Sequence, residues 1–179
     1  MGNAKIICAV GPDTLGRSRI EQFILGGMDI ARCVCLPGKA ESCIKCMQEI
    51  GMFRSKRNQP LEILFDIERT QKNTGEFTEE IRLGIRQKVG MISIPSANMQ
   101  GREKSLRKLL DENGGEQILL IAKIEDNEVA ERLETVLGSA DGIMIGRKFA
   151  EPLQQQMMKK VYEAHKIWVT ATQMLDFRA

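Results

Sequence analysis

Apolar residues recur along this chain in two different spacings, which predict alternating strands and helices. Short runs of apolar and β-branched residues, bounded by glycine or proline, are typical of strands. The run 117–124 is apolar on both faces, as expected of a parallel strand that is covered on both sides. The predicted strands span residues 5–10, 28–35, 61–67, 90–94, 117–124, 141–146 and 166–172.

Between these strands, apolar residues three and four apart predict amphipathic helices. Thr78 precedes one of them as a candidate N-cap, with two glutamates in the first turn. Strand–helix repetition of this kind predicts a parallel sheet. Two arrangements remain open: a doubly wound open sheet, or a (β/α) barrel that lacks part of its ring. The predicted helices span residues 19–25, 41–50, 79–88, 103–113, 127–137 and 152–164.

Composition and charge narrow the class of protein. The chain has 179 residues, 42% of them apolar and 28% charged, which fits one globular domain over residues 1–179. Its 26 Lys and Arg residues against 24 Asp and Glu residues give a net charge of only +2, so nothing supports binding to nucleic acid or to a membrane surface. The single histidine, His165, follows a predicted helix end, and we expect it to be solvated.

The cysteines lie mostly in one segment. Cys33 and Cys35 alternate on a predicted strand and point to one face. Cys43 and Cys46 lie three apart on the next helix, so they also share a face. The four could be drawn as a zinc site, but packing as small core residues is the favoured interpretation. Together with Cys8 the chain has five cysteines, an odd number, and its N-terminus shows no signal-peptide pattern. We therefore expect free thiols in a reducing compartment and a cytoplasmic protein.

Several segments together resemble pyruvate kinase. The most specific is Val-Thr-Ala-Thr-Gln-Met-Leu at 169–175, which begins in the last predicted strand. The resemblance follows the order of the family along nearly the whole chain. The other segments are Lys-Ile-Ile-Cys-Ala-Val-Gly-Pro at 5–12, Gly-Met-Asp-Ile-Ala-Arg at 27–32, Asn-Gly-Gly-Glu at 113–116, Ile-Ala-Lys-Ile-Glu at 121–125 and Asp-Gly-Ile-Met-Ile at 141–145.

The resemblance implies a TIM-type (β/α) barrel that is incomplete, with about seven parallel strands. The family inserts a lid domain after its third strand, and the link before the helix at 79–88 is too short to hold one. The family also has an eighth strand and a C-terminal domain, which we expect to be missing here. We therefore expect an open barrel edge between strands 5–10 and 166–172, covered by a second copy of the chain or by a protein partner.

Five residues match functional positions of the family. Arg32 corresponds to its phosphate-binding arginine, and Asp66 to a ligand of the monovalent cation. Lys123 corresponds to the lysine that stabilises the transferring phosphoryl group and the enolate. Glu125 corresponds to a carboxylate that holds the divalent metal, and Thr172 to the threonine near the protonated enolate carbon. Equally open is the alternative that the charged residues persist only as a buried ion-pair network.

Other positions depart from the family. Val34 and Leu36 replace an asparagine and a serine that bind the cation. Lys148 and Phe149 replace the glycine–aspartate pair that supplies the second metal carboxylate. These changes leave a poor site for magnesium or potassium, so we expect no cofactor; both ions would be needed if the chain were an enzyme. Further departures are Pro37, Glu68, Arg69, Thr70 and Asn73.

From these matches and losses we expect a catalytically inactive, pyruvate-kinase-like protein that acts by association or as a regulatory binding protein. We expect a residual site for a small anion or a keto acid at the barrel mouth, formed by Arg32, Lys123 and Thr172. The alternative is a minimal enzyme that acts on phosphoenolpyruvate or pyruvate by phosphoryl transfer or enolisation. In that case Lys123 and Thr172 would be its catalytic residues.

Overall fold

Seven strands alternate with seven helices along the chain. The computed structural model describes residues 4–11, 14, 16–36, 38–57, 61–68, 77–96, 103–125, 127–146 and 149–170. The strands are β1 (Ile6–Val10), β2 (Met28–Cys35), β3 (Glu62–Ile67), β4 (Met91–Pro95), β5 (Leu119–Ile124), β6 (Gly142–Ile145) and β7 (Ile167–Thr170). The helices are α1 (Arg17–Leu25), α2 (Ala40–Arg57), α3 (Thr78–Arg86), α4 (Glu103–Glu112), α5 (Asn127–Glu131), α6 (Leu133–Leu137) and α7 (Glu151–Glu163).

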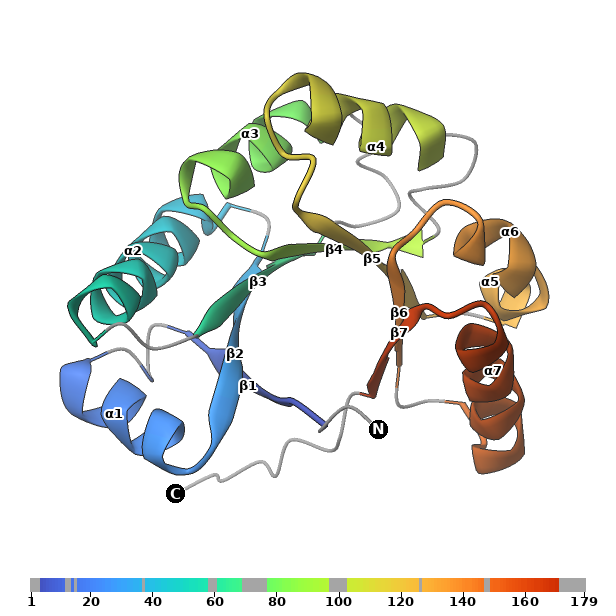
Figure 1. Ribbon diagram of the computed structural model, residues 1–179, viewed down its shortest axis with the longest axis horizontal. Helices are drawn as coiled ribbons and strands as arrows, with labels where there is room; N and C mark the ends of the chain where they lie inside the picture. Colours follow the sequence, from blue (N-terminus) through green and yellow to red (C-terminus); the bar gives the residue numbers. More distant parts are fainter. Residues whose placement is uncertain are drawn as a thin grey trace.

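The strands form one parallel sheet in the order of the sequence, from β1 to β7. Figure 1 shows that the sheet curls into an open ring, with the helices on its outer side. A doubly wound sheet would carry helices on both faces. The structure therefore confirms the incomplete (β/α) barrel and excludes the doubly wound alternative.

Most helix boundaries lie within two residues of the prediction, and three features of the helices differ in kind. α2 does not end at Gly51 but continues to Arg57, and Phe53 in this extension is buried. The single helix predicted over 127–137 is two short helices, α5 and α6, separated at Arg132. Thr78 is the first residue of α3 and not its N-cap, and the residue before it makes no capping side-chain hydrogen bond.

The buried residues form two separate cores, one on each face of the sheet. The larger core lies between the strands and the surrounding helices, and it includes Cys33, Cys35, Cys43 and Cys46. The four cysteines are thus buried core residues, as favoured from the sequence. The smaller core fills the inside of the ring and consists of Ile30, Leu64, Met91, Ile121, Met144 and Val169.

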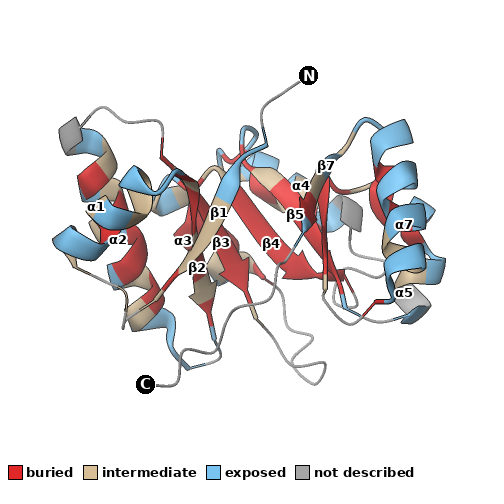
Figure 2. Cartoon of the chain, turned by 90° about the horizontal axis from the view of Figure 1, so that it is seen from below, coloured by how far each residue is buried: buried red, intermediate tan, exposed pale blue. Residues whose placement is uncertain are grey.

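Within the part of the chain that the structure describes, the sheet has two edge strands, β1 and β7. Figure 2 shows that β1 is less buried than the central strands. Ile6 on β1 is 51% exposed and Ile167 on β7 is 38% exposed. Of the helices that the structure describes, none has the length and apolar character needed to cross a membrane.

Candidate functional site

A layer of polar side chains lies inside the ring, next to the smaller core. Side chains two apart on a strand point to the same face, so Asp66 follows Leu64 inward and Lys123 follows Ile121 inward. Both polar residues lie near the carboxyl ends of their strands, where (β/α) barrels carry their functional groups. The strands thus place a polar layer at the mouth of the barrel, directly above an apolar layer.

Asp66 is the centre of this polar layer. Its side chain is fully buried, and it accepts hydrogen bonds from Arg32 Nε at 2.7 Å and from Ser93 Oγ at 2.7 Å. Lys123 Nζ lies 2.9 Å from its other oxygen, Oδ1. Burial by itself would raise the pKa of Asp66, but the charges of Lys123 and Arg32 and the hydrogen bonds outweigh burial and lower it.

Lys123 is surrounded by carboxylates. Its side chain is 3% exposed, and Nζ lies 2.6 Å from Glu68 Oε1, 2.9 Å from Asp66 Oδ1 and 3.8 Å from Glu125 Oε1. A lysine ammonium has three hydrogens to donate, and an ionised lysine is buried only when it is paired. Among the described residues, the mouth therefore holds two cations, from Lys123 and Arg32, against three carboxylates.

The donor set does not fit a divalent metal ion. The ammonium of Lys123 already lies among the three carboxylates that would have to bind such an ion. Phe149, at a metal-carboxylate position of the family, is buried in the outer core instead of facing the mouth. Within the described ranges, no cluster of three or more His, Cys, Asp or Glu side chains could hold a metal ion, and this applies to the cysteine-based zinc site as well.

Six positions singled out from the sequence lie outside the described residues: Thr172, Lys148, Pro37, Arg69, Thr70 and Asn73. Of the remaining site residues, the structure brings Arg32, Asp66, Lys123 and Glu125 into one connected group of charges. Residue by residue, the sequence named Glu68 only as a departure from the family. Its contact with Lys123 was missed, because no sequence spacing indicates that a side chain just after β3 reaches a lysine on β5.

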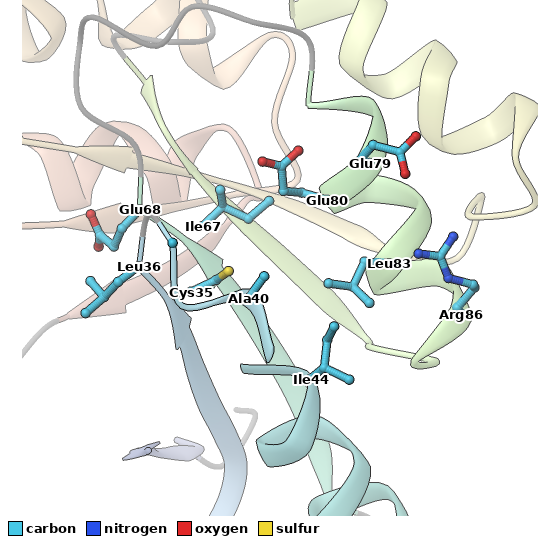
Figure 3. Close-up of a pocket in the computed structure, with 11 residues that line it drawn as sticks. Cys35, Leu36, Ala40, Ile44, Ile67, Glu68, Glu79, Glu80, Leu83 and Arg86 are labelled. Carbon is cyan, nitrogen blue, oxygen red and sulfur yellow. The ribbon is translucent and has the colours of Figure 1, made fainter. Parts of the chain in front are cut away.

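A pocket of about 360 Å³ adjoins this group of charges, at the ends of β2 and β3 and against α2 and α3. Figure 3 shows Glu68 on one side of the pocket and two glutamates of α3 on the other. The floor is apolar and includes Leu36, Ile44 and Ile67. Glu68 thus lies between the pocket, which it lines, and the barrel mouth, where it contacts Lys123.

Comparison with known proteins matches this arrangement to one family. The sequence profile of the pyruvate kinase barrel domain covers residues 72–178, more than half of the chain. The chain belongs to the pyruvate kinase family. It is 34% identical over 108 residues to a pyruvate kinase of Lactococcus lactis, a match that covers 54% of this chain and 22% of that protein. It is 30% identical over 106 residues to the pyruvate kinase of Clostridium acetobutylicum, covering 54% of this chain and 22% of the relative.

The chain spans about a fifth of the length of these curated pyruvate kinases. Lys123, Glu125 and Phe149 fall inside the segment that matches the barrel-domain profile. Arg32 and Asp66 precede that segment, so their correspondence to pyruvate kinase positions rests on the resemblance of the earlier strands. In the structure, Asp66 nonetheless forms an ion pair with Lys123, and Arg32 forms one with Asp66.

Proposed function

We propose that this chain is a non-catalytic member of the pyruvate kinase family that acts by association. The observation that carries the proposal is the contact between Lys123 Nζ and Glu68 Oε1, at 2.6 Å. A lysine that stabilises a transferring phosphoryl group must present its charge to that group. Here that charge is already neutralised by side chains of the protein itself.

The composition of the mouth also opposes phosphoryl transfer. A phosphoryl group carries negative charge, and in the part of the mouth that the structure describes three carboxylates face two cations. Phe149 offers no metal ligand, and a magnesium ion is a main source of charge stabilisation in this chemistry. The alternative of a minimal enzyme would require Glu68 to leave Lys123 before this lysine could bind a substrate.

We propose that a small anion or a keto acid can bind at the mouth only by displacing Glu68 from Lys123. Of the two carboxylates closest to Lys123, Glu68 has the more exposed side chain, at 31% against 0% for Asp66. It can therefore leave at lower cost. Arg32 is 22% exposed and would supply the second cation for a phosphate or carboxylate group. This proposal makes Glu68 an internal competitor of the ligand.

Titration calorimetry with phosphate, oxalate and pyruvate tests this proposal. We expect wild-type protein to bind at millimolar concentration, and Glu68→Gln to bind at least about tenfold more tightly, a difference of ~1.4 kcal/mol. Glu79→Gln is the matched control, because Glu79 lines the same pocket but is 77% exposed and pairs with Arg82. No binding by either protein would refute the anion site, and equal affinities would refute displacement of Glu68.

We further propose that the open sheet edge is covered by association, first with a second copy of this chain and otherwise with another protein. Edge strands present unpaired N–H and C=O groups, and β1 and β7 expose the apolar side chains Ile6 and Ile167. A symmetric dimer is the commonest way for one chain to cover such an edge.

A further inference from the structure

Two cysteines from adjacent elements meet in the outer core. Cys33 on β2 and Cys46 on α2 have their Sγ atoms 3.0 Å apart, and they are 0% and 2% exposed. This separation is shorter than the ~3.5–4.0 Å at which nonbonded carbon atoms pack. A disulfide has an S–S length of about 2.05 Å, so bond formation needs a movement of about 1 Å. Both cysteines are free thiols in the structure.

The two thiols differ in acidity. Cys33 and Cys46 share a hydrogen bond in which either sulfur can be the donor, and this bond lowers the pKa of Cys46 although burial opposes it. The same bond, together with burial, raises the pKa of Cys33. The thiolate is the nucleophilic form of cysteine. Whichever of the two sulfurs is oxidised first has the other only 3.0 Å away to resolve the product.

A second pair of thiols leads from this pair to the surface pocket. Cys43 forms a side-chain hydrogen bond with Cys35, which raises the pKa of Cys43. Cys35 lines the 360 Å³ pocket and is 8% exposed. The pocket thus brings solvent to Cys35, at the edge of the cysteine layer. We expect hydrogen peroxide to reach the buried pair from this side.

We propose that Cys33 and Cys46 are a modification site that forms a reversible disulfide when a small hydroperoxide oxidises them. One of the two sulfurs attacks the O–O bond of hydrogen peroxide as a thiolate and becomes a sulfenic acid, and one water is released after protonation. The other sulfur then attacks the oxidised sulfur and loses its proton, and the hydroxyl group leaves as a second water. Two thiols lose two electrons in total, and one peroxide is reduced to two waters.

The disulfide would attach α2 to β2 beside the open edge of the sheet. Cys46 Sγ also lies 3.5 Å from the carbonyl oxygen of Val10, on the edge strand β1. Closing a loop between residues 33 and 46 restricts the unfolded chain, so we expect the oxidised protein to unfold at a higher temperature than the reduced protein.

Peptide mapping of the full chain tests the proposal. The folded protein is treated with hydrogen peroxide, remaining thiols are alkylated in denaturant, and the chain is digested with trypsin. Trypsin separates Cys43 (peptide 40–45) from Cys46 (peptide 46–54), while Cys33 and Cys35 share peptide 33–39. We expect peptide 33–39 linked to 46–54, with fragmentation placing the bond at Cys33 and dithiothreitol releasing it.

Three results would overturn the proposal: a link between peptides 33–39 and 40–45, a bond within peptide 33–39, or full alkylation of every cysteine after treatment. Cys46→Ser is expected to abolish the link, and Cys8→Ser to leave it unchanged, because Cys8 lies on β1 outside the pair. The wild-type map is decisive by itself if Cys46→Ser does not fold. Failure here leaves the calorimetric test of Glu68 unaffected.

Discussion

At the scale of single residues, Asp66 holds the polar layer together. It accepts hydrogen bonds from Arg32 and Ser93 and lies against the ammonium of Lys123. Removing one partner of a buried ion pair leaves the others uncompensated. The stability of the domain should therefore depend on the ionised form of this one carboxyl group.

We expect Asp66→Asn to lower the free energy of unfolding at pH 7 by about 3–5 kcal/mol. The pKa of Asp66 is lower in the folded protein than in the unfolded chain, where it is about 3.9. The stabilisation by this group is complete above the unfolded pKa and is lost as the pH falls through the folded one. The difference between wild type and variant should shrink below about pH 4.

Urea unfolding between pH 3 and pH 7 measures this difference. Glu112→Gln is the control, since Glu112 is 60% exposed, pairs with Lys108 on the surface, and should contribute no more than about 1 kcal/mol. A difference for Asp66→Asn that stays constant with pH would show that the carboxyl charge is not the source of the stability.

Most of the residues in the site could be named from the sequence, because they belong to short segments that resemble the family. Lys123 and Arg32 each lie within a strand that the sequence makes recognisable. The role of Glu68 could not be predicted, since it depends on how far β3 and β5 curl toward each other. His165 is exposed, as its position after a helix indicated.

At the scale of elements, the strands were predicted within a few residues because their apolar runs are short and sharply bounded. Helix lengths were harder to predict, since tertiary packing can override a local breaker. Gly51 indicated a helix end in the sequence, but α2 continues past it to Arg57, and Phe53 in this extension is buried. The break between α5 and α6 carries no glycine or proline that would have indicated it.

The two glycines Gly51 and Gly142 should respond oppositely to the same substitution. A Cβ at Gly51 would meet nothing within 4 Å, so Gly51→Ala should raise the free energy of unfolding by about 0.5–1 kcal/mol. A Cβ at Gly142 would lie 2.7 Å from Ile167 Cβ and 2.9 Å from the Ile167 carbonyl oxygen. Gly142→Ala should therefore lower the free energy of unfolding by about 1–3 kcal/mol, because β6 and β7 must move apart to make room for the methyl group.

Urea denaturation of both variants under the same conditions checks this pair of predictions, with each serving as the control for the other. Stabilisation by Gly142→Ala would mean that β7 does not pack against β6 as closely as the structure has it. Destabilisation by Gly51→Ala would mean that α2 does not continue through residue 51 in solution.

At the scale of the whole molecule, we propose that the open edge between β1 and β7 determines how the chain associates in solution. The side chain of Val169 on β7 points into the ring, so the residues that mark the edge are Ile6 and Ile167. We expect light scattering at micromolar concentration to give a mass well above 20.1 kDa. A lysine at an exposed edge position should oppose such pairing.

Ile6→Lys should accordingly lower the measured mass toward that of one chain. Met52→Lys is the matched control, because Met52 is 55% exposed on α2 and not on an edge strand. A wild-type protein that stays at 20.1 kDa without aggregating would refute self-association through the edge. The alternative that another protein covers the edge would then stand.

Absence of phosphoryl transfer is the central claim about the site, and a coupled assay for pyruvate tests it most directly. Purified protein is supplied with phosphoenolpyruvate, ADP, magnesium and potassium, and a pyruvate kinase serves as the positive control. With Lys123 neutralised by Glu68 and no carboxylate at Phe149, we predict pyruvate formation no faster than in the protein-free blank. Magnesium-dependent turnover that Lys123→Met abolishes would contradict the account.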